Sequence, residues 1–95
     1  MTKKKIKRNK FHVGRIVATP GVLAAVPTDE LISAMKRHLA GDWGVVSAED
    51  QAANDQAVKK GLRILSAYLA KDGTRFWVIT EADRSATTFL LPDEY

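Results

Sequence analysis

The chain contains no cysteine, which excludes disulfide bonds and thiolate metal sites. It has no apolar run approaching the roughly 18 residues that a membrane-spanning helix needs, and no apolar signal segment follows its basic start. The sequence therefore predicts a cytoplasmic protein with no membrane partner. The chain has 95 residues, of which 45% are hydrophobic and 27% charged, and this length and composition predict one domain with a modest core.

Acidic residues are absent from the first 28 positions, where seven basic residues lie. The rest of the chain has eight bases against eleven acids, so the net charge of +4 comes from the N-terminal segment. This composition predicts a flexible basic tail over residues 1–10, followed by a single domain over residues 11–95. Lysines and arginines that contact phosphates release counterions, so the tail is a candidate site for RNA or DNA. Its candidate contacts are Lys3, Lys4, Lys5, Lys7, Arg8 and Lys10.

Apolar spacing predicts a first strand from Phe11 to Val17, in which Ile16 indicates burial on both faces. Thr19 and Pro20 are typical of a helix start and predict a short helical turn over residues 20–26. A second helix is expected to begin with Thr28 as its cap and to stop at Gly41.

Ser47 and Asp50 have capping-box spacing and predict a third helix to Lys60, closed by Gly61. Its expected inner face consists of small apolar residues: Ala53, Ala57 and Val58.

The last third predicts three antiparallel strands over residues 62–70, 75–81 and 86–91. Asp72-Gly73 indicates a two-residue turn, which would place Tyr68 opposite Trp77. The expected helix-facing side consists of Leu65, Ala67, Leu69, Phe76 and Val78. The expected opposite side consists of Ser66, Tyr68, Arg75, Trp77, Ile79 and Glu81.

The order of these elements predicts an α+β fold: a small single domain with an N-terminal strand, and two to three helices packed on one face of a mainly antiparallel sheet that ends in a three-stranded meander. The other sheet face is then open to a partner. Tyr68 and Trp77 beside Arg75 have the composition of a surface that stacks nucleic-acid bases, or of a protein-binding hot spot. The simpler interpretation is that the two rings only stabilise the sheet.

Two further groups have catalytic composition. His38 and Asp42 are four residues apart, a spacing at which a carboxylate orients an imidazole, although a helix-terminal histidine more often complements the helix dipole. Glu81 and Arg84 lie in a polar turn that either clamps a phosphate or only satisfies its own backbone. His12 and His38 are the only histidines, and neither has ligands at metal-site spacing, so we expect no metal and no cofactor.

Several segments resemble a family of short bacterial proteins of plasmids and integrative elements, which is described only as plasmid-related. The segments are 37–44 (RHLAGDWG), 54–55 (ND), 63–68 (RILSAY), 77–85 (WVITEADRS) and 91–95 (LPDEY). The order of elements is also similar to the small ribonuclease-toxin fold of barnase-like and RelE-like enzymes. The resemblance implies an accessory protein of a mobile genetic element that acts on nucleic acid or its machinery, with ribonuclease-like activity as the leading version.

The ribonuclease analogy implies specific roles. Glu81 or His38 would take the 2′-hydroxyl proton, and Arg63 or Arg84 would clamp the phosphate, with Tyr68 as a further site residue. The alternative is a non-enzymatic protein-binding module that inhibits or recruits a host factor through its exposed sheet face.

Overall fold

The computed structural model describes residues 9–95. In chain order they form β1 (Arg15–Ala18), α1 (Pro20–Ala25), α2 (Thr28–Leu39), α3 (Ala48–Lys60), β2 (Ile64–Leu69), β3 (Arg75–Thr80), β4 (Ala86–Leu90) and a final 3-10 turn, η1 (Pro92–Glu94). The predicted α+β class and the predicted order of elements are confirmed.

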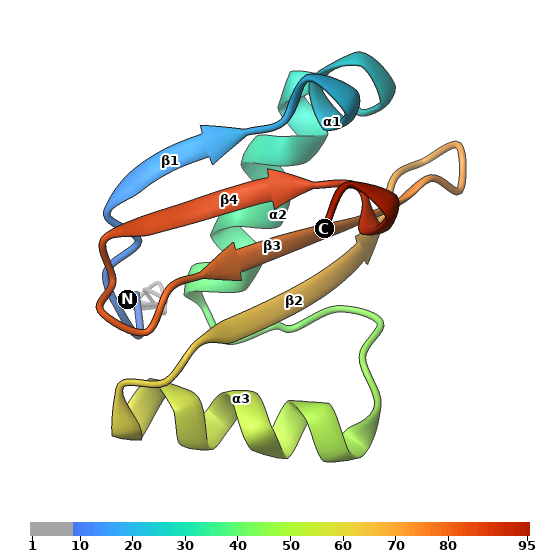
Figure 1. Ribbon diagram of the computed structural model, residues 1–95. Coiled ribbons are helices and arrows are strands. Elements are labelled where there is room, and N and C mark those ends of the chain that lie inside the picture. The colour runs from blue at the N-terminus through green and yellow to red at the C-terminus, as the bar shows by residue number, and fades with distance from the viewer. Residues whose placement is uncertain (1–8) are drawn as a thin grey trace, which may run out of the picture.

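The four strands form one mixed sheet with the order β1-β4-β3-β2. β2, β3 and β4 make the expected antiparallel meander, whereas β1 pairs in parallel with β4 and occupies one edge. At the other edge, Gly44 forms a bridge with Ala67, so the loop before α3 covers part of β2. Figure 1 shows α2 behind the sheet and α3 along the β2 edge, while no α-helix within residues 9–95 crosses the face turned to the viewer.

The ends of α1 and α3 follow local sequence signals. The Thr19 hydroxyl accepts the Val22 N–H, and Pro20 is the first helical residue. The Ser47 hydroxyl accepts the Asp50 N–H, and Gly61 ends α3 with a φ of 68°. α2 differs, because Pro27 precedes its first turn and no side chain caps it. The predicted Thr28 cap is therefore wrong.

The predicted register of the β2–β3 hairpin is also wrong. Ala70 N–H donates to the Thr74 carbonyl, and Gly73 N–H donates to the Ala70 carbonyl, so the loop has three residues. Gly73, with a φ of 90°, takes the left-handed position that such a loop requires. Tyr68 consequently pairs with Phe76. A shift of one residue in the register turns every side chain of a strand to the other face of the sheet. Each β2 side chain therefore lies on the face opposite to the predicted one.

The first strand is shorter than predicted. The chain bends at Gly14, which has a φ of 63° and where a Cβ would overlap the backbone of Arg84 and Ser85. Phe11 lies before this bend and packs in a side cluster with Trp43, Ala57 and Ile64. Ile16 is 57% exposed, so its predicted burial on both faces is wrong, as expected for an edge strand.

The main core lies between the sheet and the helices α1 and α2. Its buried members are Val22, Val26, Leu31, Ala34, Tyr68, Ala70, Phe76, Val78 and Phe89. On α3, Ala57 and Val58 face inward as predicted, but Ala53 is exposed. Its place is taken by Asn54, whose amide donates to the Leu65 carbonyl and whose oxygen accepts the Leu65 N–H. α3 therefore holds the β2 edge through polar bonds as well as apolar packing.

None of the helices within residues 9–95 is long and apolar enough to cross a membrane.

Candidate functional site

His38, a predicted catalytic residue, lies at the centre of a buried polar chain. Its Nδ1 is 2.6 Å from the Ser66 hydroxyl, and its Nε2 is 2.8 Å from the Thr80 hydroxyl. Thr80 in turn bonds the Thr87 hydroxyl at 2.7 Å, which donates to the Val13 carbonyl at 2.8 Å. The imidazole has no exposed surface. The chain of bonds ties α2 to three strands and to the segment before β1.

The order of these bonds fixes the protons on His38. The Thr87 hydroxyl donates its only proton to the Val13 carbonyl, so the Thr80 hydroxyl must donate to Thr87. Thr80 then accepts from His38 Nε2–H, and in the neutral ring Nδ1 accepts the Ser66 proton. The network therefore places the proton of the neutral imidazole on Nε2. Burial, followed by the charge of Arg84, lowers the pKa of His38 to about 4, which agrees with the neutral form.

Arg84 is fully engaged in holding the main chain. Its guanidinium donates to the carbonyls of Leu62 (2.7 Å), Ala57 (2.9 Å) and Glu81 (3.0 Å). Arg84 itself has a φ of 60°, an uncommon backbone conformation for a residue other than glycine. The cation thus satisfies carbonyls at the C-terminal end of α3 and in the turn before β4. These contacts explain Arg84 as a structural residue.

The predicted Tyr68 position on the open face is wrong, because the register change turns the ring inward. The residue is 1% exposed, and its hydroxyl donates to the Asp42 carbonyl at 2.7 Å. Burial raises the pKa of Tyr68 to about 12. The sequence interpretation of Tyr68 and Trp77 as cross-strand neighbours on an exposed surface therefore does not hold.

Trp77 does lie on the open face, and its aromatic partner there is Tyr95. The two ring centroids are 5.7 Å apart at 68°, an edge-to-face arrangement. Trp77 is half-buried, whereas Tyr95 is 68% exposed. The sequence reasoning missed Tyr95. The available signal was Pro92 at the start of a helical turn, which folds the last residues back onto the sheet.

Arg63 and Glu81 are brought together at the end of the same face. Arg63 Nε lies 3.5 Å from a Glu81 carboxylate oxygen, and its guanidinium donates to the Tyr95 hydroxyl and lies 5.3 Å from the centre of that ring. We call the group formed by Arg63, Trp77, Glu81 and Tyr95 the open-face cluster. The cluster offers two aromatic surfaces and a cation that is half-exposed to solvent.

Two further arginines lie on the same face of the sheet as the open-face cluster. Arg75 and Trp77 are two residues apart on β3, so their side chains lie on the same face of the sheet. Arg15 lies on this face as well, because it pairs with Ala86. Both arginines are exposed. The four strands contain no aspartate or glutamate. The strands therefore contribute only basic charges to this face, and the acids close to it in sequence are Glu81 after β3 and Asp93 and Glu94 in η1.

Most of the tail predicted to bind nucleic acid lies outside the described residues: Lys3, Lys4, Lys5, Lys7 and Arg8. Lys10 is described and exposed, and its N–H donates to the Leu39 carbonyl at 2.9 Å. The chain is therefore already attached to the end of α2 at residue 10.

Within residues 9–95, no group of three or more histidine, aspartate or glutamate side chains is placed to hold a metal ion. No protein-family model matches the chain, and no curated protein and no solved structure matches it either. The likeness to plasmid-related proteins and to barnase-like or RelE-like enzymes therefore stays a prediction.

Proposed function

We propose that the chain binds single-stranded nucleic acid on the open face of its sheet. The observation that carries this proposal is an acid-free set of strands whose side away from α2 holds the Trp77 and Tyr95 rings between Arg63 and Arg75. Single strands are bound in this way, by aromatic rings on which bases stack and by cations that track the phosphates. A duplex hides the faces of its bases, so this surface favours unpaired strands.

The contacts within the open-face cluster support a division of roles. Tyr95 is the more exposed ring and would stack a base, with Trp77 supporting it edge-on and offering its own exposed part to a neighbouring base. Arg63 is held beside Tyr95 and next to Glu81, so it is positioned before any ligand arrives. Arg75 and Arg15 extend the cationic surface across the strands, and the basic residues of the N-terminal segment would add contacts that are independent of sequence.

The proposal does not include RNA cleavage. Of the residues assigned to it, His38 and Tyr68 are buried, and Arg84 is bonded to main-chain carbonyls. Arg63 and Glu81 remain at the surface but pair with each other. An accessory role on a mobile element is part of the proposal only through the sequence resemblance.

The test is the binding of labelled single-stranded oligonucleotides, oligo(dT) and oligo(U), followed by fluorescence anisotropy. Stacking of one base is worth about 1–3 kcal/mol, so Trp77→Ala and Tyr95→Ala should each weaken binding on the order of 5- to 150-fold. Lys59→Ala on α3 removes an exposed cation from another surface and is the matched control. It should change affinity only slightly.

Salt titrations separate the face from the N-terminal segment. Deleting residues 1–8 should reduce the salt dependence of binding while leaving the effect of Trp77→Ala intact, because stacking releases few counterions. The proposal fails if the wild-type protein does not bind either oligonucleotide. It also fails if the deletion abolishes binding and Trp77→Ala has no effect. Absence of oligonucleotide binding would favour the protein-binding alternative for the same face.

A further inference from the structure

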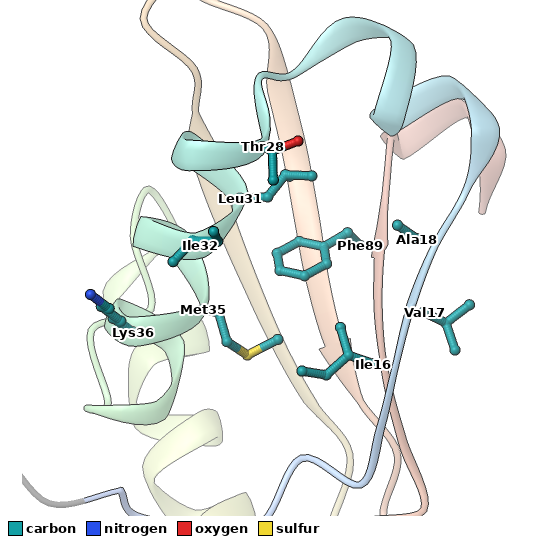
Figure 2. Close-up of a pocket in the computed structure, with 9 residues that line it drawn as sticks. All are labelled: Ile16, Val17, Ala18, Thr28, Leu31, Ile32, Met35, Lys36 and Phe89. Atoms are coloured by element: carbon teal, nitrogen blue, oxygen red, sulfur yellow. The ribbon is translucent and has the colours of Figure 1, made fainter.

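The β1 edge of the sheet carries an apolar groove that the proposed function does not use. It lies between β1 and α2 and has a volume of about 470 Å³. Figure 2 shows Ile16 and Met35 at one end of this groove, Thr28 at the other, and the Phe89 ring between them. Ile16 and Ile32 are 57% and 53% exposed. Such an arrangement leaves apolar side chains in water beside a strand with one unpaired edge.

β1 has a free hydrogen-bonding edge. Arg15 N–H donates to the Ser85 carbonyl and Thr19 N–H donates to the Phe89 carbonyl, so the odd-numbered residues direct their backbone groups toward β4. The N–H and C=O groups of Ile16 and Ala18 therefore point away from the sheet. Between Ile16 and Ala18 there is no proline, charged residue or bulge, the devices that usually protect an edge strand.

We infer that β1 pairs in antiparallel fashion with β1 of a second copy of this chain, with Val17 opposite the partner's Val17. This register places Ile16 opposite the partner's Ala18, so the four outward N–H and C=O groups of each copy all find partners. It also packs a large side chain beside a small one, because the partner's Ile16 enters the groove above Ala18. The result is an isologous dimer with an eight-stranded sheet.

Charge complementarity supports a second copy of the chain as the partner of β1. The same register sets Arg15 opposite the partner's Thr19. The Thr19 hydroxyl donates to Glu94 at 2.6 Å, and the Gly21 N–H donates to the same carboxylate at 3.1 Å, so Glu94 is held beside residue 19. These bonds lower the pKa of Glu94, with the Thr19 bond as the largest cause, so the carboxylate is ionised at neutral pH. Arg15 makes no ion pair or hydrogen bond through its side chain within residues 9–95.

By symmetry the dimer would form this Arg15–Glu94 contact twice, on the side of the sheet that carries the open-face cluster. The inference does not rest on the proposed function. If both hold, the two open faces join on one side of a continuous sheet.

The first experiment measures the mass of the full chain by sedimentation equilibrium over a range of concentrations. Wild type should shift from monomer toward dimer, whereas Ile16→Lys should stay monomeric. Leu62→Lys, which alters a residue that is 51% exposed on another surface, should behave like wild type. Because Ile16 is mostly exposed, thermal unfolding should show that Ile16→Lys keeps its fold. Arg15→Glu should weaken association several-fold, and Lys59→Glu should not.

A second experiment tests the register. The chain has no cysteine, so Val17→Cys introduces a single thiol. Facing residues at a pair without hydrogen bonds have Cβ atoms about 4.5–5.5 Å apart, which suits a disulfide after a small adjustment. Val17→Cys should form a covalent dimer much faster than Leu69→Cys, a 51% exposed control on β2. A monomer at every concentration, or equal cross-linking of the two variants, would overturn the inference and leave the edge to a strand from another protein.

Discussion

The buried His38 makes the stability of this protein depend on pH in a way that can be calculated. In the unfolded chain the imidazole has a pKa of 6.5, and in the folded chain its pKa is about 4. The unfolded state therefore takes up a proton first as the pH falls. The contribution of neutral His38 to the free energy of unfolding is fully present above pH 6.5 and is lost as the pH falls from 6.5 to 4. Below pH 4 the ring is protonated in both states, so the loss does not grow further.

The size of this effect follows from the gap between the two pKa values. One pKa unit corresponds to about 1.4 kcal/mol, so a difference of 2.5 units gives roughly 3 kcal/mol. Small domains have total stabilities of about 5–15 kcal/mol, so the loss is a large fraction of the whole. Burial gives the main physical reason, because the charged ring would lose its hydration inside the protein, and the positive charge of Arg84 disfavours a second cation there.

The assay is urea unfolding at a series of pH values between 7 and 4, for wild type and His38→Gln. Carboxylates also titrate in this range, but they are the same in both proteins, so the difference between the two pH profiles isolates His38. Wild type should lose roughly 3 kcal/mol more than His38→Gln across this range. His12→Gln, which removes an exposed imidazole, is the control and should follow wild type. Parallel profiles for wild type and His38→Gln would refute the assignment of a neutral, buried His38.

Further predictions concern Arg84, Gly73, Gly44 and Tyr68. Arg84→Ala should lower the free energy of unfolding by about 2 kcal/mol, because it leaves carbonyls at the end of α3 without their charged donor, whereas Arg75→Ala should change it little. Gly73→Ala should cost about 1–2 kcal/mol for its left-handed φ alone, as measured by urea unfolding. Gly44→Ala should cost a further 1–3 kcal/mol or so, since its Cβ would also overlap the Ala67 carbonyl and the Tyr68 ring. Tyr68→Phe should cost about 1–2 kcal/mol, because the Asp42 carbonyl loses the donor from Tyr68; stability equal to wild type would contradict the bond.

Local chemistry was sufficient to predict much of the fold. Ser47 and Gly61 set the ends of α3 because a cap and a left-handed glycine act on their immediate neighbours. The register of the β2–β3 hairpin was harder to predict. Asp72-Gly73 is compatible with loops of two or three residues, and β2 has apolar residues on both faces, so its pattern does not select one register. The predicted exposure of Tyr68 failed for that reason.

The candidate site depended on contacts that are distant in sequence. His38 bonds Ser66 and Thr80, which are 28 and 42 residues away, so no local pattern reveals that its two ring nitrogens are already satisfied. Trp77 and Arg75 were correctly placed on the open face, because alternation along a strand is local. Tyr95 was missed because only the folded chain brings it back over the sheet.

The central claim is that the open face binds unpaired nucleic acid through Trp77 and Tyr95, and the two indole N–H signals of the protein test it directly. Trp43 is 3% exposed and its indole donates to Asp55, so it serves as an internal control. On titration with an unlabelled oligo(U), we predict that the NMR signal of the Trp77 indole N–H shifts while that of Trp43 stays in place. Binding that leaves the Trp77 signal unmoved, or that perturbs both signals equally, would contradict the account.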